Sequence, residues 1–367
     1  MDETTIERQV CAAPGARHTL SGNGAHADPG AMDHARIGRK GSAVKMLKHA
    51  SVWLLLIVSA AAAAQQSRED AWWTGPMLAP NAATLPHGHA LIEPYLFDII
   101  TTGHFDANGD KHSAAVDHTI GSLTYMLYGV TDDITAGLIP HFFFAAPAGA
   151  PHSSGVQFGD LTLQLGYGLT HDRDGGNTPD ISLVLQETLP TGRYDRLTRS
   201  SDGFGAGAWT TSINLYMQDY FWMPNGRILR ARLALTYGIS SSVSVHDQSV
   251  YGTANGFSGR AWPGDSFTAD AAAEYSLTRH WVLAFDVVYQ HNDSTRVAGT
   301  VPTASMPMTG DAGFAQESGS SYSLGFAPAI EYNWTSRFGA LLGVRIIEIG
   351  RNTSATITPA IALNMVF

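Results

Sequence analysis

The sequence predicts an all-β protein, an antiparallel transmembrane β-barrel of about 12 strands with both chain ends on the periplasmic side. Three observations predict this class. Segments of about ten residues alternate between apolar and polar residues and are separated by turns. After residue 64, no apolar run reaches the roughly 18 residues that a membrane helix needs. Glycine (38 residues) and aromatics (10%) are plentiful while charged residues make up 15%, a composition that suits strands and turns.

The first 64 residues predict an export signal. Basic Lys48 precedes an apolar stretch from Val52 to Val58, and small residues follow, with Ala62 and Ala64 at the positions that signal peptidase reads. We expect cleavage before Gln65. A membrane anchor is the alternative, but the thirteen residues 52–64 are too few for one. Residues 1–45 are polar, and a signal peptide should begin near a chain start, so translation is expected to start at Met46 and residues 46–64 form the signal.

Residues 65–88 are rich in Trp, Pro and Gly and predict a periplasmic segment that lies in the barrel mouth or partly enters the lumen. If it obstructs the path, its deletion should raise conductance. The barrel is then expected over 89–367. We predict strands near 89–101, 118–130, 134–145, 158–170, 180–190, 207–221, 227–242, 264–278, 281–292, 320–334, 338–350 and 355–367. Short turns should lie in the periplasm, and long loops such as 243–263 and 293–319 outside the cell.

Alternation along single strands distinguishes two faces. In GDLTLQLGYGLT, the side chains of Leu163, Leu165 and Tyr167 share one face and those of Thr162 and Gln164 the other. A soluble β-sandwich alternates too. Aromatic residues near the ends of the apolar faces favour the barrel, because such rings form girdles at the membrane interfaces.

A spaced motif, tyrosine followed three residues later by threonine, recurs before turns. It is expected to place one ring of each hairpin in the same interfacial girdle. The four tyrosines are Tyr128, Tyr167, Tyr275 and Tyr332. Chance spacing among the 13 tyrosines of the chain is the alternative.

The stretch ITPAIALNMVF alternates up to Phe367, so the last predicted strand has an apolar outer face. Such a strand should close the barrel against the first one. We expect its outward residues to form the signal that outer-membrane assembly machinery reads. They are Ile361, Leu363, Met365 and Phe367.

Within the predicted strands, seven charged residues lie on the face opposite to the apolar one. A charge at the lipid midplane costs about 2–4 kcal/mol for arginine, so these side chains should point into the lumen. They either line a polar path that selects solutes or form cross-strand ion pairs that fill a narrow barrel. Replacing Arg230 and Arg232 with Ala should change conductance or ion preference if they line a pore. The set is Arg230, Arg232, Asp270, Glu274, Asp286, Glu331 and Arg345.

Four stretches resemble a known family. WWTGPMLAPNAATLPHGHALIEPYLFD (72–98), QETLPTGRYDRL (186–197), YFWMPNGRILR (220–230) and EYSLTRHWVLAFDVVY (274–289) are similar to the phenol meta-cleavage-pathway family (MetA-pathway of phenol degradation) of outer-membrane transporters. The resemblance implies an outer-membrane barrel that helps small aromatic or other hydrophobic compounds to enter. The family supplies no agreed functional residues.

Other sites are weaker. FDANGDKHSAAVD begins like a calcium loop, but Lys111 stands where that motif needs glycine, which favours a polar loop. His87 and His89 share a face without a third ligand, so no metal site is expected. Three arginines (Arg193, Arg196 and Arg199) either meet lipopolysaccharide phosphates or form a solvated loop.

Function follows from these features. We expect a bacterial outer-membrane channel for passive entry of small, hydrophobic or aromatic solutes, with membrane lipid, lipopolysaccharide and the assembly machinery as partners. An acidic chain with net charge −10 does not suit nucleic acid, and no cofactor is implied. A lipid hydrolase is one alternative, with His141 in a lipid-facing dyad. A structural or adhesion barrel without transport is the other.

Overall fold

The computed structural model describes residues 65–171, 178–302 and 311–367. The predicted signal peptide and the residues before it lie outside this part of the chain. Among the described residues, no helix is both long and apolar enough to cross a membrane. Apart from two 3-10 turns, η1 (Arg68–Asp70) and η2 (Ser200–Asp202), the regular structure is antiparallel β.

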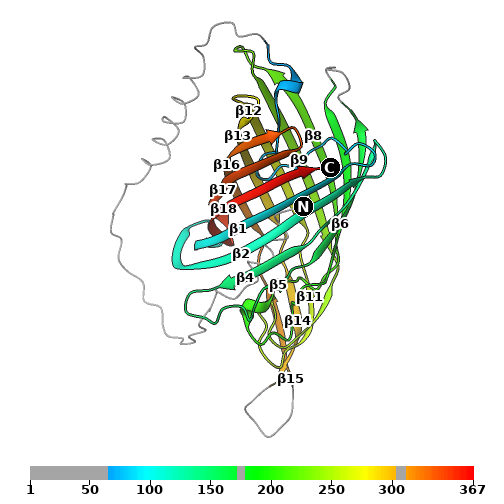
Figure 1. The fold of residues 1–367 in the computed structure, drawn as a ribbon. Helices are drawn as coiled ribbons and strands as arrows, with labels where there is room; N and C mark the ends of the chain where they lie inside the picture. Colours follow the sequence, from blue (N-terminus) through cyan, green and yellow to red (C-terminus); the bar gives the residue numbers. More distant parts are fainter. Residues whose placement is uncertain (1–64, 172–177, 303–310) are drawn as a thin grey trace, which may run out of the picture.

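A closed barrel of twelve antiparallel strands forms the body of the molecule, which confirms the predicted fold class (Figure 1). Each predicted strand overlaps one wall strand, because the period-2 alternation marks the residues that face opposite sides of the sheet. The wall strands are β1 (Ala90–Phe105), β2 (Lys111–Gly129), β3 with β4 (Ile134–Ile139 and His141–Ala146), β6 (Leu161–Thr170), β7 (Asp180–Leu189), β8 (Thr210–Trp222), β9 (Ile228–Ser240), β12 (Ser266–Ser276), β13 (Trp281–Asn292), β16 (Ser321–Thr335), β17 (Phe338–Arg351) and β18 (Thr353–Val366).

The third wall strand is interrupted at Pro140. Proline has no N–H to donate to a neighbouring strand, so the ladder breaks there into β3 and β4. β2 pairs with both pieces, β3 pairs with β6, and β4 pairs with the short β5 (Gln157–Phe158).

β1 and β18 join to close the barrel. Leu91 pairs with Val366, and the backbones of Ala90 and Phe367 exchange hydrogen bonds of 3.2 and 2.8 Å. β1 also pairs with β2, so neither edge of the sheet is left open.

The outer face of the barrel is apolar. Side chains that the alternation placed there are well exposed, among them Leu165 (53%) and Ile361 (47%). The four motif tyrosines lie near the ends of β2, β6, β12 and β16 where short turns follow, and we call this the short-turn end. The inward positions of the same strands are buried.

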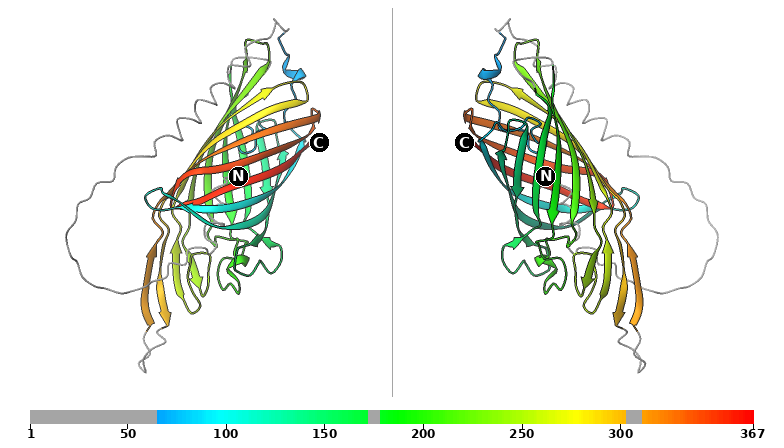
Figure 2. Two further views of the ribbon diagram at one scale, coloured as in Figure 1. Left: turned by 90° about the vertical axis from the view of Figure 1, so that its left-hand side faces the viewer. Right: turned by 90° about the vertical axis from the view of Figure 1, so that its right-hand side faces the viewer.

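The opposite, long-loop end contains more strand than we predicted. Residues predicted as long loops form a second sheet, in the order β10 (Val243–His246), β11 (Ser258–Trp262), β14 (Arg296–Pro302) and β15 (Asp311–Glu317). Its apolar cluster includes Val245, Phe257 and Val297, so the hairpins bury a small core of their own. This sheet projects beyond the barrel wall (Figure 2).

Candidate functional site

Residues 65–89 enter the barrel, and we call them the N-terminal segment. The segment starts at the short-turn end, where the N–H of Gln66 donates to the carbonyl of Gly226 at 2.8 Å. It returns to the same end before β1, where the N–H of Leu85 donates to Oγ1 of Thr135 at 2.9 Å. Between these points its backbone bonds to inward side chains of β13, β16 and β18. The segment therefore forms a loop that dips into the lumen.

A buried ion network lies beside this loop. Nε and Nη2 of Arg230 on β9 donate to the two oxygens of Glu274 on β12, at 2.6 and 2.5 Å. The two residues are paired across the strands, and Nε of Arg232 lies 3.0 Å from the same carboxylate. A bidentate bond of this kind is among the strongest ion pairs. The Arg230 guanidinium also lies over the ring of Trp73 of the N-terminal segment, 4.6 Å from its centroid.

Two further carboxylates hold the segment's backbone. Asp286 accepts hydrogen bonds from the N–H groups of Met77, Leu78 and Ala79 at 3.0–3.3 Å. Glu331 accepts from those of Thr74 (2.7 Å) and Gly75 (3.2 Å).

Other contacts fix the same turn of the segment. Arg232 donates to the Ala79 carbonyl at 2.8 Å. Gly75 has a φ of +134°, a conformation that side-chain-bearing residues rarely adopt, so glycine is required at this turn.

Two asparagines complete this attachment, and our sequence analysis did not single them out. Oγ1 of Thr74 donates to Oδ1 of Asn333 at 2.9 Å, and Nδ2 of Asn333 donates to the Trp72 carbonyl at 3.1 Å. Nδ2 of Asn364 donates to the Thr74 carbonyl at 3.4 Å. Both asparagines occupy inward-facing positions in the alternation of β16 and β18, and this is the sequence signal that could have identified them.

The predicted lumen residues do not act as one group. All seven are buried. Arg230, Arg232, Asp286 and Glu331 contact the N-terminal segment, and Glu274 binds the two arginines. Arg345 instead donates to Oε1 of Gln290 on β13, at 2.8 Å. Asp270 lies on β12, four residues from Glu274 toward the long-loop end.

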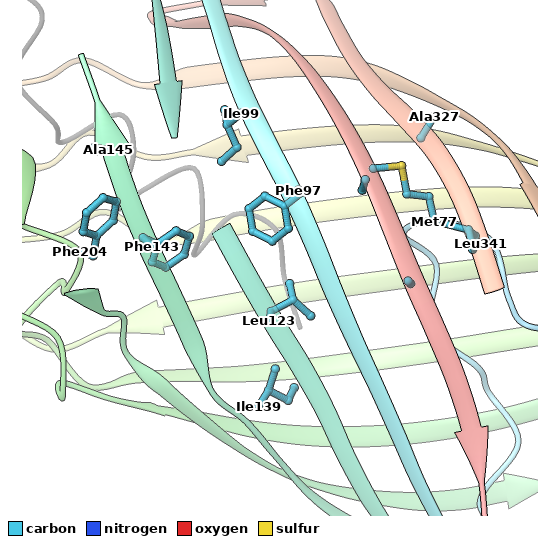
Figure 3. Close-up of a cluster of buried hydrophobic side chains, with 12 residues drawn as sticks. Met77, Phe97, Ile99, Leu123, Ile139, Phe143, Ala145, Phe204, Ala327 and Leu341 are labelled. Atoms are coloured by element: carbon cyan, nitrogen blue, oxygen red, sulfur yellow. The ribbon is translucent and has the colours of Figure 1, made fainter. Parts of the chain in front are cut away.

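Another part of the inner wall, mainly on β1 to β4, β17 and β18, carries a cluster of buried apolar side chains, and we call this cluster the apolar strip. It runs from Met77 of the N-terminal segment to Phe204 in the loop between β7 and β8 (Figure 3). Phe143 stacks on Phe204 with ring centroids 4.8 Å apart, and its edge meets Phe97 at 6.3 Å. The strip comprises Met77, Phe97, Ile99, Leu123, Ile139, Phe143, Ala145, Phe204, Ala327, Leu341, Ala360 and Ala362.

His141 does not face lipid, contrary to the dyad that we considered. It is 2% exposed and shares the inward face of β4 with Phe143. Its Nδ1 lies 2.7 Å from the Asp160 carbonyl, and Nε2 has no partner among the described residues. The sequence did not show which way the His141 side chain points. Ile139 and Phe143 lie on the same face of the strand, and apolar residues of this kind can face either the lipid or an apolar interior.

The weaker candidates form local structure. Oδ1 of Asp106 accepts from the N–H groups of Asn108 and Asp110, and Oδ2 bonds His112, so this stretch is a tight turn between β1 and β2. The His112 bond and the backbone donors lower the pKa of Asp106 to about 2. Nδ1 of His87 bonds the Val130 carbonyl. No group of three metal-ligating side chains occurs within the described ranges.

One solved structure shares this fold, and two others show a weaker likeness. The COG4313 outer membrane channel from Pseudomonas putida F1 matches with a TM-score of 0.61 and 17% identity, over 79% of this chain and 100% of that one. The β domain of the Bordetella autotransporter BrkA (TM-score 0.42, 10% identity, 77% and 100%) and the toluene transporter TodX of Pseudomonas putida (0.36, 12%, 82% and 96%) are more distant barrels. No curated protein matches the chain.

The family model described as "Putative MetA-pathway of phenol degradation" matches residues 101–358, which is more than half of the chain and extends from β1 to β18. The chain therefore belongs to the MetA-pathway of phenol degradation family, as its sequence resemblance indicated.

Proposed function

We propose that the protein is a passive channel of the bacterial outer membrane for small hydrophobic or aromatic compounds. The observation that carries the proposal is the apolar strip. An ordinary water-filled barrel has a polar interior, whereas this inner wall carries stacked Phe143 and Phe204 beside Phe97 and Leu123. Apolar solutes partition onto such a surface, because contact removes apolar area from water. The family's association with phenol degradation and the channel fold agree with this proposal.

The N-terminal segment acts as the gate of this channel. It is bound to the polar side of the lumen through Asp286, Glu331 and Arg232, while Met77 packs into the apolar strip. Because five of its backbone N–H groups donate to two carboxylates, the segment can leave only by exchanging those bonds for water. Passage along the strip therefore requires Met77 to move.

The membrane orientation is part of the same proposal. The short-turn end faces the periplasm and the long-loop end faces outward, as in barrels of this kind. Arg193, Arg196 and Arg199 then meet lipopolysaccharide phosphates, and the tyrosine girdle contacts the interface. The outward residues of β18, from Ile361 to Phe367, are read during assembly. Export uses the signal of residues 46–64.

Catalysis is not part of the proposed function. A histidine-activated nucleophile needs a hydroxyl or thiol within hydrogen-bond reach of the free imidazole nitrogen. In the described part of the chain, Nε2 of His141 has no such group as a partner. Phospholipid hydrolysis by the purified barrel, lost on His141→Ala, would contradict this view.

The test is permeation by the full protein in liposomes. Proteoliposomes containing a dye that responds to phenol should report faster entry of phenol than protein-free liposomes, and a solute such as glucose should enter no faster. Single-channel recording in a planar bilayer, with and without phenol, shows whether entry accompanies openings. Equal phenol entry with and without the protein would contradict the proposed function.

A further inference from the structure

We propose that His141 forms a specificity site for solutes that combine an apolar ring with one hydrogen-bond donor, such as a phenolic hydroxyl. The inference rests on the proposed function and assigns a substrate class to the apolar strip. It starts from a buried polar atom that has no hydrogen-bond partner among the described residues.

The tautomer of His141 is fixed by its surroundings. Nδ1 lies 2.7 Å from the Asp160 carbonyl, which can only accept, so Nδ1 carries the proton and donates. Neutral imidazole then has its lone pair on Nε2. Nε2 is therefore an acceptor, and it is the atom without a partner in the part of the chain that the structure describes.

Asp160 is itself held firmly, which keeps the imidazole in place. Its two carboxylate oxygens accept from the N–H groups of Gly192 (2.8 Å) and Ala206 (2.7 Å), and its side chain is fully buried. The N–H of Gly159 also donates to the His141 carbonyl at 3.0 Å. The acceptor is consequently preorganised by the backbone of residues 159–160 and by the loop that contains Phe204.

Apolar side chains surround this acceptor. Leu123 on β2 is paired with His141 on β4. Ile139 and Phe143 flank His141 on the same inward face. The imidazole lies nearly parallel to the Phe143 ring, with 14° between the planes. Phe143 in turn stacks on Phe204 with 7° between the ring planes (Figure 3), so the three rings lie nearly parallel to one another.

These features select the ligand. Stacked phenylalanines favour a flat apolar ring, since aromatic pairs gain energy beyond the area they bury. A lone imidazole acceptor favours a donor on that ring, because an unpaired buried acceptor is costly. Phenol satisfies both requirements and toluene only the first.

The experiment compares two probes that differ by one hydroxyl. Binding of 4-fluorophenol and fluorobenzene to the full protein in detergent is followed by ¹⁹F NMR, with protein-free micelles subtracted. The wild type should prefer 4-fluorophenol by about fivefold, the value of one neutral hydrogen bond. His141→Leu should lower this ratio to about one while fluorobenzene still binds. Gln186→Leu, which changes an inward polar residue on β7 bonded to Gln164, should keep the wild-type ratio.

Two results would overturn the site. One is equal preference in the wild type and His141→Leu, and the other is a wild type that does not distinguish the probes. The second result decides the question even if the variant does not fold. Failure of the proposed function is recognised separately, since phenol then enters proteoliposomes no faster than protein-free liposomes. If phenol enters but the probe ratio is unaffected by His141→Leu, only the His141 site is wrong.

Discussion

The charged and the apolar parts of the inner barrel wall contact the N-terminal segment in different ways. On β9, β12, β13 and β16, charged side chains bind the N-terminal segment with directional bonds. On β1, β2, β4 and β17, apolar side chains contact each other and Met77 without such bonds. Hydrogen bonds fix a peptide in one position, whereas apolar contact is non-directional and tolerates exchange of one apolar group for another. We conclude that the polar side anchors the gate and the apolar side forms the route.

Removal of the gate should have the largest effect. A variant lacking residues 66–85 leaves the polar anchors facing an empty lumen, so we expect a closed or rarely open channel to become steadily open in planar bilayers. The matched control is deletion of part of the β14–β15 hairpin, which projects beyond the wall and should leave conductance unchanged. Unchanged conductance after removal of 66–85 would show that the segment does not obstruct the path.

The Arg230–Glu274 pair should be the most sensitive point for stability. Arg230→Met leaves a fully buried carboxylate with weaker compensation, which costs about 3–5 kcal/mol of the free energy of unfolding. The double variant Arg230→Met with Glu274→Leu removes both charges but leaves Arg232 without this carboxylate, so it should recover only part of this loss. Urea unfolding in detergent micelles measures both values. A single variant as stable as the double one would mean that the ion pair is not the anchor of this side.

Asp286 should control the gate with a smaller effect. Asp286→Ala removes the acceptor of three backbone N–H groups, and an unmade bond to a buried donor costs about 1–3 kcal/mol. Even the loss of about 1.4 kcal/mol makes release tenfold more frequent. Asp286→Asn keeps one acceptor oxygen and should give an intermediate opening frequency. If single-channel recordings show the same frequency for wild type, Asn and Ala, Asp286 does not hold the gate.

The apolar side should give the smallest change and only in transport. Ile99→Thr keeps a β-branched shape but adds a hydroxyl to the strip, so phenol entry should slow by a few-fold while opening frequency stays the same. Val184→Thr, an equally buried change on β7 outside the strip, is the control. Equal entry rates for both variants would mean that solutes do not travel along the strip.

The wall strands could be predicted from sequence because period-2 alternation is imposed by the lipid and the lumen on every strand. Parity also placed Arg230 and Glu274 on inward positions of neighbouring strands. A cross-strand ion pair was one of the two interpretations of these charges, and the structure pairs the two residues. The sheet of β10, β11, β14 and β15 was not predicted, because its strands are short and the turn residues around them are typical of loops. Its signal was the alternation of Val243 and Val245.

The docking of the N-terminal segment could not be predicted in the same way. Most of its bonds come from backbone N–H groups, which every residue except proline carries, so the sequence of the segment contains little trace of its partners. The carboxylates that accept them lie more than 200 residues later in the chain. Gly75 was the one local sign of the required turn.

The seam between β1 and β18 has a consequence for how the chain can be rearranged. Leu91 and Val366 are paired neighbours although they are almost the whole barrel apart in sequence. Once the seam is formed, every wall strand has two partners, and the sheet has no first or last member. A circular permutant that links the end of β18 to residue 65 and opens the chain at the MPNG turn (223–226) should therefore close into the same cylinder. Its β8 and β9 would then meet as the terminal strands.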